Sequence, residues 1–265
     1  MFNMNVVVCV KQTPETAEVE LSLDESGRGI KTEGLVFEMN EWDEYALEEA
    51  LLLKERLGGE VTAVTMGPEG ADAVLRRCLA KGADNAIWLK DEAFKGSDAY
   101  ATAKILHAAV KGLEFDLVMA GAQASDDGHG AVGVILAELL DIPHASMVKK
   151  VETGEGSLKV NRELEGGLEE VVELSMPAVL TIQTGINEPR YVSIMGIRRA
   201  RKMELTVMAL ADLGLSKEDV GEDGSWMRVE RVYRPPVDKE PVMMTGSPDE
   251  IAGALVEMFR ARGLV

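Results

Sequence analysis

Three glycines in the middle of the chain, Gly128, Gly130 and Gly133, have the spacing G-x-G-x-x-G, which is typical of loops that bind phosphate. Glycine lets a backbone approach a phosphate closely, and the first N–H groups of a helix offer hydrogen bonds and partial positive charge. A predicted strand precedes the motif and a predicted helix follows it. Three interpretations stay open: a bound nucleotide, a nicotinamide cofactor, or a helix start that merely packs closely on a sheet.

The residues around the motif favour a nucleotide over a nicotinamide turn. The motif follows the fourth predicted strand, and the connection from Gly121 is too long for the tight turn of a dinucleotide fold. Asp126 and Asp127 would lie near a phosphate, which is unfavourable unless they cap the helix or bind ribose hydroxyls. Acid–base catalysis by this adjacent pair would require both side chains to converge on one substrate, which neighbours seldom do.

A second candidate segment, Asn-Glu-Trp-Asp at 40–43, opens a long predicted helix. Asp43 is a candidate N-cap, whereas the indole of Trp42 offers stacking area to a ligand, and the two interpretations are compatible. No cluster of His, Cys and Asp has metal-ligand spacing, and no nucleophile–base set can be assembled. We therefore predict neither a metal site nor catalytic residues from the three histidines, His107, His129 and His144.

Residues 186–202 form the one basic island of the chain. Apolar side chains flanked by guanidinium groups are typical of a protein-docking loop, and an ordinary solvated helix start is the alternative. The island contains Arg190, Arg198, Arg199, Arg201 and Lys202 together with Tyr191, Ile194, Met195 and Ile197.

Strands and helices alternate four times in the first half of the chain, which predicts a doubly wound, mostly parallel α/β sheet. Such sheets bind ligands beyond the carboxyl ends of their strands. This prediction points to the loops at 11–14, 39–43, 66–70 and 121–133. The expected strands are 6–10, 61–66, 86–89 and 117–120, and the expected helices are 43–57, one carrying Val74, Leu75, Cys78 and Leu79, 98–111 and 130–140.

Extra elements interrupt this alternation. Alternating residues at 19–23, a turn and a restart at Ile30 predict a hairpin between the first strand and the first helix. Strands at 148–151, 158–160, 171–174 and 179–182 follow without helices long enough to cross between them. Beyond residue 205 the chain is polar, and it ends in a predicted helix at 249–262.

Composition limits the function further. The chain has 265 residues, 46% of them hydrophobic, and a formal net charge of −18. The negative charge argues against a general nucleic-acid binder, which needs basic residues to neutralise phosphates. Cys9 and Cys78 are interpreted as buried small hydrophobes rather than a disulfide. No secretion signal or bilayer-spanning stretch is predicted, which favours a cytoplasmic protein.

Residues 161–205 contain R-x-x-x-G-G-x-E, P-A-V-x-T and N-E-P-R-Y patterns, followed by a basic run. This segment resembles the signature region of electron-transfer flavoprotein beta subunits, also called the FixA family. Matching stretches VVVCVKQTPET, NEWDEYALEEALLLKE, MGPEGADAVLRRCLAKGAD and GAQASDD occur in the family's order. The resemblance spans about residues 4–205.

The resemblance implies an electron carrier rather than an enzyme, built on an adenine-nucleotide-binding α/β domain at 1–205 with a docking loop near 186–202. It implies a C-terminal arm at 206–265 that packs on a flavin-carrying alpha subunit. The beta subunit of such a heterodimer binds AMP or, in electron-bifurcating members, a second FAD. Electrons would come from acyl-CoA or other flavin dehydrogenases, as in fatty acid oxidation, and pass to a quinone reductase-type acceptor without membrane insertion.

The resemblance also implies site residues. The docking residues would be Arg190, Tyr191, Ile194, Met195 and Ile197, with Ile194 as the apolar anchor. The nucleotide-binding residues would be Cys9, Asn40, Glu41, Trp42, Asp43, Met66, Asp126, Asp127, Gly128, His129, Gly130, Ala131, Val132, Gly133 and Val134.

Two positions depart from the family pattern. The bifurcating pattern D-G-D-T-A-Q-V-G reads D-D-G-H-G-A-V-G here at 126–133, and the family's Asn-Pro at the helix entry is Asn40-Glu41. The ligand therefore stays open between AMP and FAD. A stand-alone, adenine-nucleotide-binding regulator of the stress-protein type is the alternative function.

Overall fold

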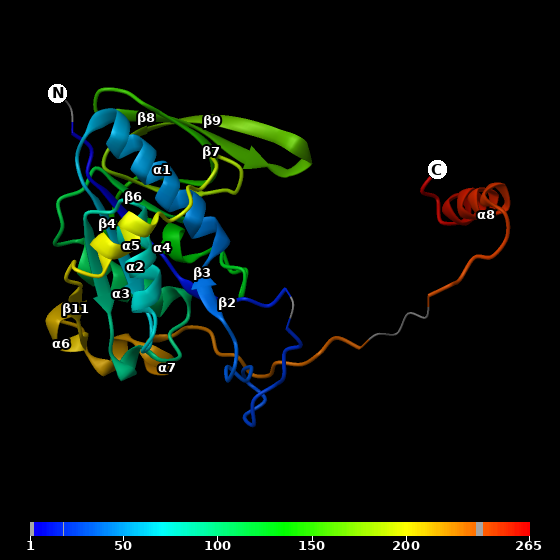
Figure 1. The fold of residues 1–265 in the computed structure, drawn as a ribbon, viewed down its shortest axis with the longest axis horizontal. Coiled ribbons are helices and arrows are strands. Elements are labelled where there is room, and N and C mark those ends of the chain that lie inside the picture. Colours follow the sequence, from blue (N-terminus) through cyan, green and yellow to red (C-terminus); the bar gives the residue numbers. More distant parts are fainter. Residues whose placement is uncertain (1–2, 18, 237–240) are drawn as a thin grey trace.

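The computed structural model describes residues 3–17, 19–236 and 241–265. Its centre is a nine-stranded sheet with the strand order β11-β5-β4-β1-β6-β10-β7-β8-β9 (Figure 1). The first seven strands in this order are parallel to their neighbours, and the last two continue β7 as an antiparallel meander. Their bounds are β11 (Thr206–Met208), β5 (Asn85–Leu89), β4 (Val61–Met66), β1 (Val6–Cys9), β6 (Leu117–Gly121), β10 (Ala178–Ile182), β7 (His144–Thr153), β8 (Ser157–Leu164) and β9 (Leu168–Ser175).

Helices cover both faces of the parallel part, as expected for a doubly wound sheet. Along β1, Val6 and Val8 pack into the core under α1 (Glu41–Leu57) and α2 (Asp72–Lys81). The alternating residue Val7 packs into the core under α3 (Ala99–Val110) and α4 (Val132–Leu140). This strand is buried on both sides, which explains its continuous run of valines.

The sheet reverses its direction of winding next to β1. The chain passes from β1 to β4 and β5 on one side, and then returns to β6 on the other side. In open parallel sheets the crevice for ligands lies at such a switch point, beyond the carboxyl ends of the strands. The loops after β1 and β6 therefore border the expected crevice.

The predicted hairpin after the first strand is present, although its paired strands lie at its base. Short strands β2 (Gln12–Pro14) and β3 (Phe37–Met39) pair antiparallel, and an isolated bridge joins Leu23 to Ile30 farther out. The excursion brings the chain back to the start of α1 beside the end of β1. The described residues also contain three short 3-10 helices, at Glu92–Phe94, Glu165–Gly167 and Lys217–Asp219.

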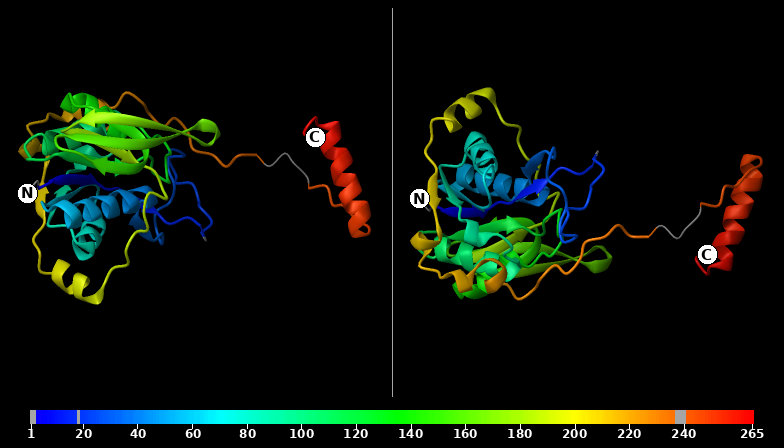
Figure 2. Two further views of the ribbon diagram at one scale, coloured as in Figure 1. Left: turned by 90° about the horizontal axis from the view of Figure 1, so that it is seen from above. Right: turned by 90° about the horizontal axis from the view of Figure 1, so that it is seen from below.

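The expected C-terminal arm begins with a portion that packs on the α/β body. β11 extends the sheet beside β5, and α6 (Leu210–Leu213) and α7 (Gly221–Gly224) lie against α3. The ring of Trp226 stacks on Tyr100 with centroids 4.0 Å apart. Beyond this contact, the chain is hydrogen-bonded to the hairpin: the Arg28 guanidinium donates to the carbonyl of Val229 at 2.7 Å, and the N–H of Val232 donates to the carbonyl of Gly27 at 2.9 Å. The terminal helix α8 (Pro248–Ala261) lies apart from the α/β body, and none of its residues is buried (Figures 1 and 2).

None of the helices in the described residues combines the length and the apolar content needed to cross a membrane.

Candidate functional site

Asp43, in the first turn of α1, joins the carboxyl ends of the two central strands. Its Oδ2 accepts a hydrogen bond from the backbone N–H of Lys11 at 2.7 Å, and its Oδ1 accepts one from Gly121 at 2.8 Å. The residue is only 5% exposed. The Asp43 side chain thus provides hydrogen-bond acceptors for two backbone N–H groups at the point where β1 and β6 stop pairing.

Burial governs the ionisation of the groups at this junction. Burial raises the pKa of Asp43 to about 7, while the hydrogen bonds from Lys11 and Gly121 act in the opposite direction. Burial, with a smaller contribution from the charge of Asp43, raises the pKa of Cys9 to about 12. The Cys9 thiol is therefore neutral near pH 7 and lies at the end of β1 as a small apolar group.

The expectation that Asp43 is the N-cap of the first long helix is wrong. α1 begins at Glu41 and its N-cap is Asn40, whose side chain makes no capping hydrogen bond. The Asn40 amide instead donates to the carbonyl of Gln123 at 2.8 Å and accepts from the N–H of Ser125 at 3.1 Å. Tethering the loop after β6 takes precedence over capping, because this buried side chain has both partners at hand.

Trp42 lies beside the crevice but its polar group is already engaged. The indole N–H donates to Oε1 of Gln183, just after β10, at 2.9 Å. A Cβ built on Gly121 would approach the Trp42 Cβ to 2.6 Å, so the strand end and the helix start are in close contact. The indole therefore bridges α1 and the end of β10, and only its ring faces are left for a ligand.

The glycine motif forms a loop followed by a helix start. Gly128 and Gly130 have φ of +63° and +59°, a conformation that favours glycine, and α4 begins at Val132 rather than at the expected residue 130. Gly133 serves close packing, because a Cβ there would lie 2.4 Å from Cγ2 of Thr181 on β10. The long loop between Gly121 and Gly128 differs from the tight turn of a dinucleotide fold, whereas close packing by the last glycine is common to both.

The start of α4 offers free backbone donors at the crevice. No side chain caps this helix, and its N-cap residue is Ala131. The first helical N–H groups lack acceptors within the helix, so they are available to a phosphate. The donors are those of Val132, Gly133 and Val134, which are among the expected binding residues.

Lys11, in the loop after β1, forms an ion cluster with the two aspartates of the loop after β6. The Lys11 ammonium lies 2.6 Å from Oδ1 of Asp126 and 2.9 Å from Oδ2 of Asp127. Burial lowers the pKa of Lys11, but the hydrogen bonds to Asp126 and Asp127 outweigh it and the pKa is raised. The ammonium partly neutralises the carboxylates, so a phosphate at the nearby helix amides would meet less repulsion. The carboxylate oxygens could still accept hydrogen bonds from hydroxyl groups of a ligand.

The loop before α4 is closely folded. Backbone amides suit a phosphate, and a Cβ on Gly130 would approach the Ala122 carbonyl oxygen to 3.1 Å, so the loop is folded as closely as glycine allows. His129 donates its backbone N–H to Asp127 at 2.9 Å, which fixes the carboxylate. Glu41 is exposed at the start of α1, and Met66 is partly buried at the end of β4.

Lys11 was not among the predicted site residues, although it lies in one of the loops predicted to border the site. The signal was a lysine directly after a buried strand, in the position where parallel sheets hold ligands. Its partners Asp126 and Asp127 are more than one hundred residues away in the sequence, so the pairing cannot be read from spacing.

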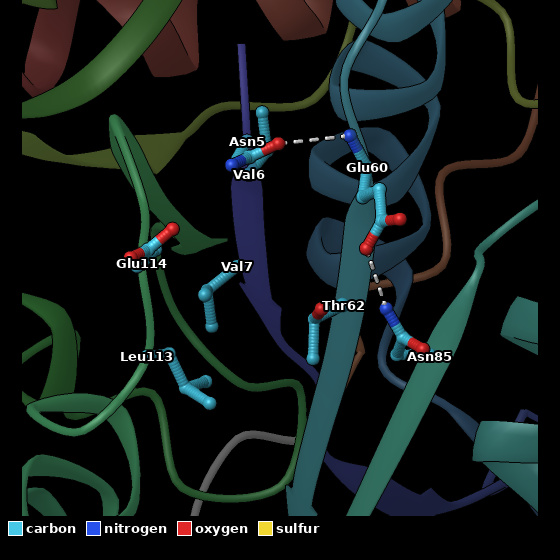
Figure 3. A pocket seen from close by; sticks show the side chains of 8 residues that line it. All are labelled: Asn5, Val6, Val7, Glu60, Thr62, Asn85, Leu113 and Glu114. Carbon is cyan, nitrogen blue, oxygen red and sulfur yellow. Dashed lines mark hydrogen bonds between the residues drawn. The ribbon is translucent and has the colours of Figure 1, made fainter.

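A different cavity lies at the amino ends of β1, β4 and β5 (Figure 3), whereas the crevice lies at the carboxyl ends of the strands. Its volume is about 250 Å³. Glu60 in its wall accepts a hydrogen bond from the Asn85 amide at 3.1 Å, and Glu114 is also part of the lining. Its carboxylates disfavour an anion such as a phosphate.

The predicted docking residues lie together on and before α5 (Ile194–Ala200), which packs on α2. Tyr191 is 99% exposed, and Ile194 and Met195 are each 73% exposed, so apolar side chains face the solvent. Ile197 is also exposed. Arg190 differs, because its guanidinium is bound within the chain by Glu48 and Glu55.

Within the part of the chain that the structure describes, no group of three or more His, Cys, Asp or Glu side chains is arranged to hold a metal ion.

Comparison with known proteins places this arrangement in context. The sequence model of the electron transfer flavoprotein domain matches residues 29–213. The chain is 40% identical to the electron transfer flavoprotein subunit beta of Methylophilus methylotrophus over 97% of this chain and 98% of that protein. It is 38% identical to the caffeyl-CoA reductase-Etf complex subunit CarD of Acetobacterium woodii, over 99% and 100% of the two chains. It is 37% identical to protein FixA of Azotobacter vinelandii, over 88% and 84%.

Proposed function

The chain belongs to the family of electron transfer flavoprotein beta subunits, and from this premise we propose that it binds an adenine nucleotide and passes electrons together with a flavin-carrying alpha subunit. The nucleotide would be AMP or a second FAD. The electrons would come from acyl-CoA or other flavin dehydrogenases and leave to a quinone reductase-type acceptor. The flavin supplies the redox chemistry when it is bound, and this chain supplies binding, orientation and docking.

The observation that carries the nucleotide proposal is the uncapped start of α4 at the switch point of the sheet. The free amides of residues 132–134 directly follow the loop after β6. Asn40 tethers this loop through Gln123, and Lys11 contacts it through Asp126. A phosphate accepts hydrogen bonds from the amides, and the aspartates accept hydrogen bonds from ribose hydroxyls.

The proposal predicts a specific bound ligand. The chain, co-expressed with its genomic alpha-type partner and purified, is expected to release AMP or FAD on heating, in an amount comparable to the chain itself. Mass spectrometry of the released fraction identifies the nucleotide. A chain that purifies alone, colourless, stable and without nucleotide contradicts the proposal and favours a stand-alone regulator, and a rise of NADH fluorescence on titration favours a nicotinamide site.

The proposed docking role predicts a kinetic defect without flavin loss. Replacing Ile194 with alanine removes most of an exposed apolar side chain whose burial in a partner contributes about 1.5–3 kcal/mol, so the KM of an acyl-CoA dehydrogenase for this flavoprotein is expected to rise about tenfold or more. Stopped-flow or steady-state reduction measures this change. Val36→Ala, at another exposed apolar position, serves as the control. Loss of flavin in the Ile194 variant contradicts the docking role.

A further inference from the structure

Glu48 is a buried carboxylate that lies in the middle of α1, far from the proposed nucleotide loop. It is 3% exposed. Its oxygens accept hydrogen bonds from the backbone N–H of Arg190 at 2.9 Å, from Nε at 2.9 Å and from Nη2 at 2.8 Å. Such a two-pronged guanidinium–carboxylate contact fixes orientation as well as distance, because both groups are planar.

Neighbouring side chains strengthen the same attachment. The remaining guanidinium nitrogen of Arg190, Nη1, donates to Glu55 at 2.6 Å. The Asn187 amide donates to Oε2 of Glu49 at 3.1 Å and to the carbonyl of Tyr45 at 3.2 Å. Residues 187–190 are thus attached along one helix immediately before the exposed apolar residues begin.

The other end of the exposed segment is attached to α2. The Arg76 guanidinium donates to the carbonyl of Ala200 at 2.7 Å and also to that of Met203. The Arg199 guanidinium donates to the carbonyl of Leu79 at 2.8 Å. The segment 191–199 is therefore held at both ends, one by α1 and the other by α2, while its apolar side chains face outward.

α1 also connects this segment to the nucleotide loop. Its first turn holds the ends of β1 and β6 through Asp43, and its middle holds Arg190 through Glu48. Because α1 is a continuous helix, the two attachments have a fixed separation and orientation. A partner that docks on 191–197 is thereby placed at a defined position relative to the loop at the crevice.

We propose that Glu48 and Arg190 are positioning residues for electron delivery: the ion pair between the buried Glu48 and the partly exposed Arg190 fixes the docking segment 191–197 relative to the nucleotide-binding end of the molecule. This inference rests on the proposed docking function. Arg190 itself, which the family resemblance implies as a docking residue, acts from inside the chain, because three of its donors are used by α1. Productive electron transfer depends on the distance and orientation of the docked partner, so a loosened segment lowers the efficiency of encounter.

Two variants test the pair in the full chain. Glu48→Gln removes the charge and replaces one acceptor oxygen with a donor, and Arg190→Lys keeps the charge but loses the fork. Hydrogen exchange of the amides in 191–200 is expected to accelerate about tenfold in both, while the amides of α2 exchange as in the wild type. Glu152→Gln, which breaks the exposed pair with Lys150, is the matched control. Arg190→Lys replaces a partly exposed side chain and keeps the test informative if Glu48→Gln does not fold.

The functional measurement separates positioning from simple support of the fold. With an acyl-CoA dehydrogenase reduced by its acyl-CoA substrate, the KM for the flavoprotein is expected to rise about tenfold, while nucleotide and flavin content stay constant. Folded variants whose exchange at 191–200 is unchanged overturn the inference, and so does faster exchange with an unchanged KM. If Ile194→Ala itself leaves the KM unchanged, the docking function fails, whatever the exchange data show.

Discussion

Replacing Asp43 with alanine is expected to lower the free energy of unfolding by about 2–5 kcal/mol at pH 5, because the change leaves the backbone N–H groups of Lys11 and Gly121 buried without an acceptor. Each unsatisfied buried donor costs about 1–3 kcal/mol. Urea unfolding of the full chain, followed by circular dichroism, measures the difference.

Asp43→Asn is the matched variant, because it preserves the volume of the side chain. Its amide oxygen can accept from one of the two N–H groups, but its NH₂ meets the other donor. We expect it to lose roughly half as much stability as the alanine variant. Equal stability of the wild type and both variants would show that the two strand ends do not depend on this carboxylate.

The pH dependence of the free energy of unfolding provides a second test of Asp43. The pKa of Asp43 in the folded chain, about 7, lies above the value of about 3.9 for an unfolded aspartate. Between these values the folded state binds more protons, so the contribution of Asp43 to the free energy of unfolding falls as pH rises from about 4 to about 7. The stability lost in Asp43→Ala is therefore expected to be larger at pH 5 than at pH 8.

Replacing Ala131 with aspartate is expected to reduce nucleotide retention at least tenfold, if the start of α4 holds the phosphate. Ala131 is the N-cap residue, so the new carboxylate lies beside the first-turn amides and repels a phosphate there. A repulsion of about 1.4 kcal/mol lowers the affinity for the nucleotide tenfold, and the repulsion between the new carboxylate and the phosphate is expected to exceed this value. The nucleotide that remains after purification is measured by mass spectrometry and absorbance.

Ala131→Asn is the control for this change. It has the shape of the aspartate variant without the charge, and both residues are tolerated at a helix start. The Asn variant is expected to keep most of its nucleotide, and neither nucleotide-free variant is expected to unfold at a lower temperature than the nucleotide-free wild type, because Asp and Asn are better N-cap residues than Ala. An aspartate variant that retains as much nucleotide as the wild type contradicts the placement of the phosphate at α4.

Patterns along the chain predicted the parallel core well, because burial of each element is a local property of its residues. The valines of β1 and the periodic apolar face of α1 both lie in the core. The strands after residue 146 were also predicted, but not their directions: β8 pairs antiparallel with β7 and β9, whereas β10 pairs parallel with β6 and β7. β11 was missed, because three residues at the sheet edge with two exposed side chains have no clear pattern.

The site was harder to predict, because its contacts join residues that are distant in sequence. Asp43 has the chemistry of an N-cap, and only the arrival of Lys11 and Gly121 gives its carboxylate other donors. The basic island shows the same limit. Its arginines suggested an exposed charged rim, but Arg190 and Arg199 donate to α1 and α2, because buried acceptors on these helices face them. The apolar residues Tyr191, Ile194, Met195 and Ile197 are exposed as expected, and so are Arg198, Arg201 and Lys202.

The position of β1 has a consequence for how the chain is made. β1 precedes both of its neighbours in the chain and lies in the middle of the sheet, where Val6 pairs with Val61 on one side and with Leu117 on the other. The face with Val6 and Val8 can be covered once α1 and α2 have been synthesised, but the face with Val7 stays without cover until α3 and α4 follow. Pairing over such separations is slow, and exposed apolar strands associate with each other while they wait. We expect chaperone dependence during biosynthesis to be set by this strand rather than by the late-made arm.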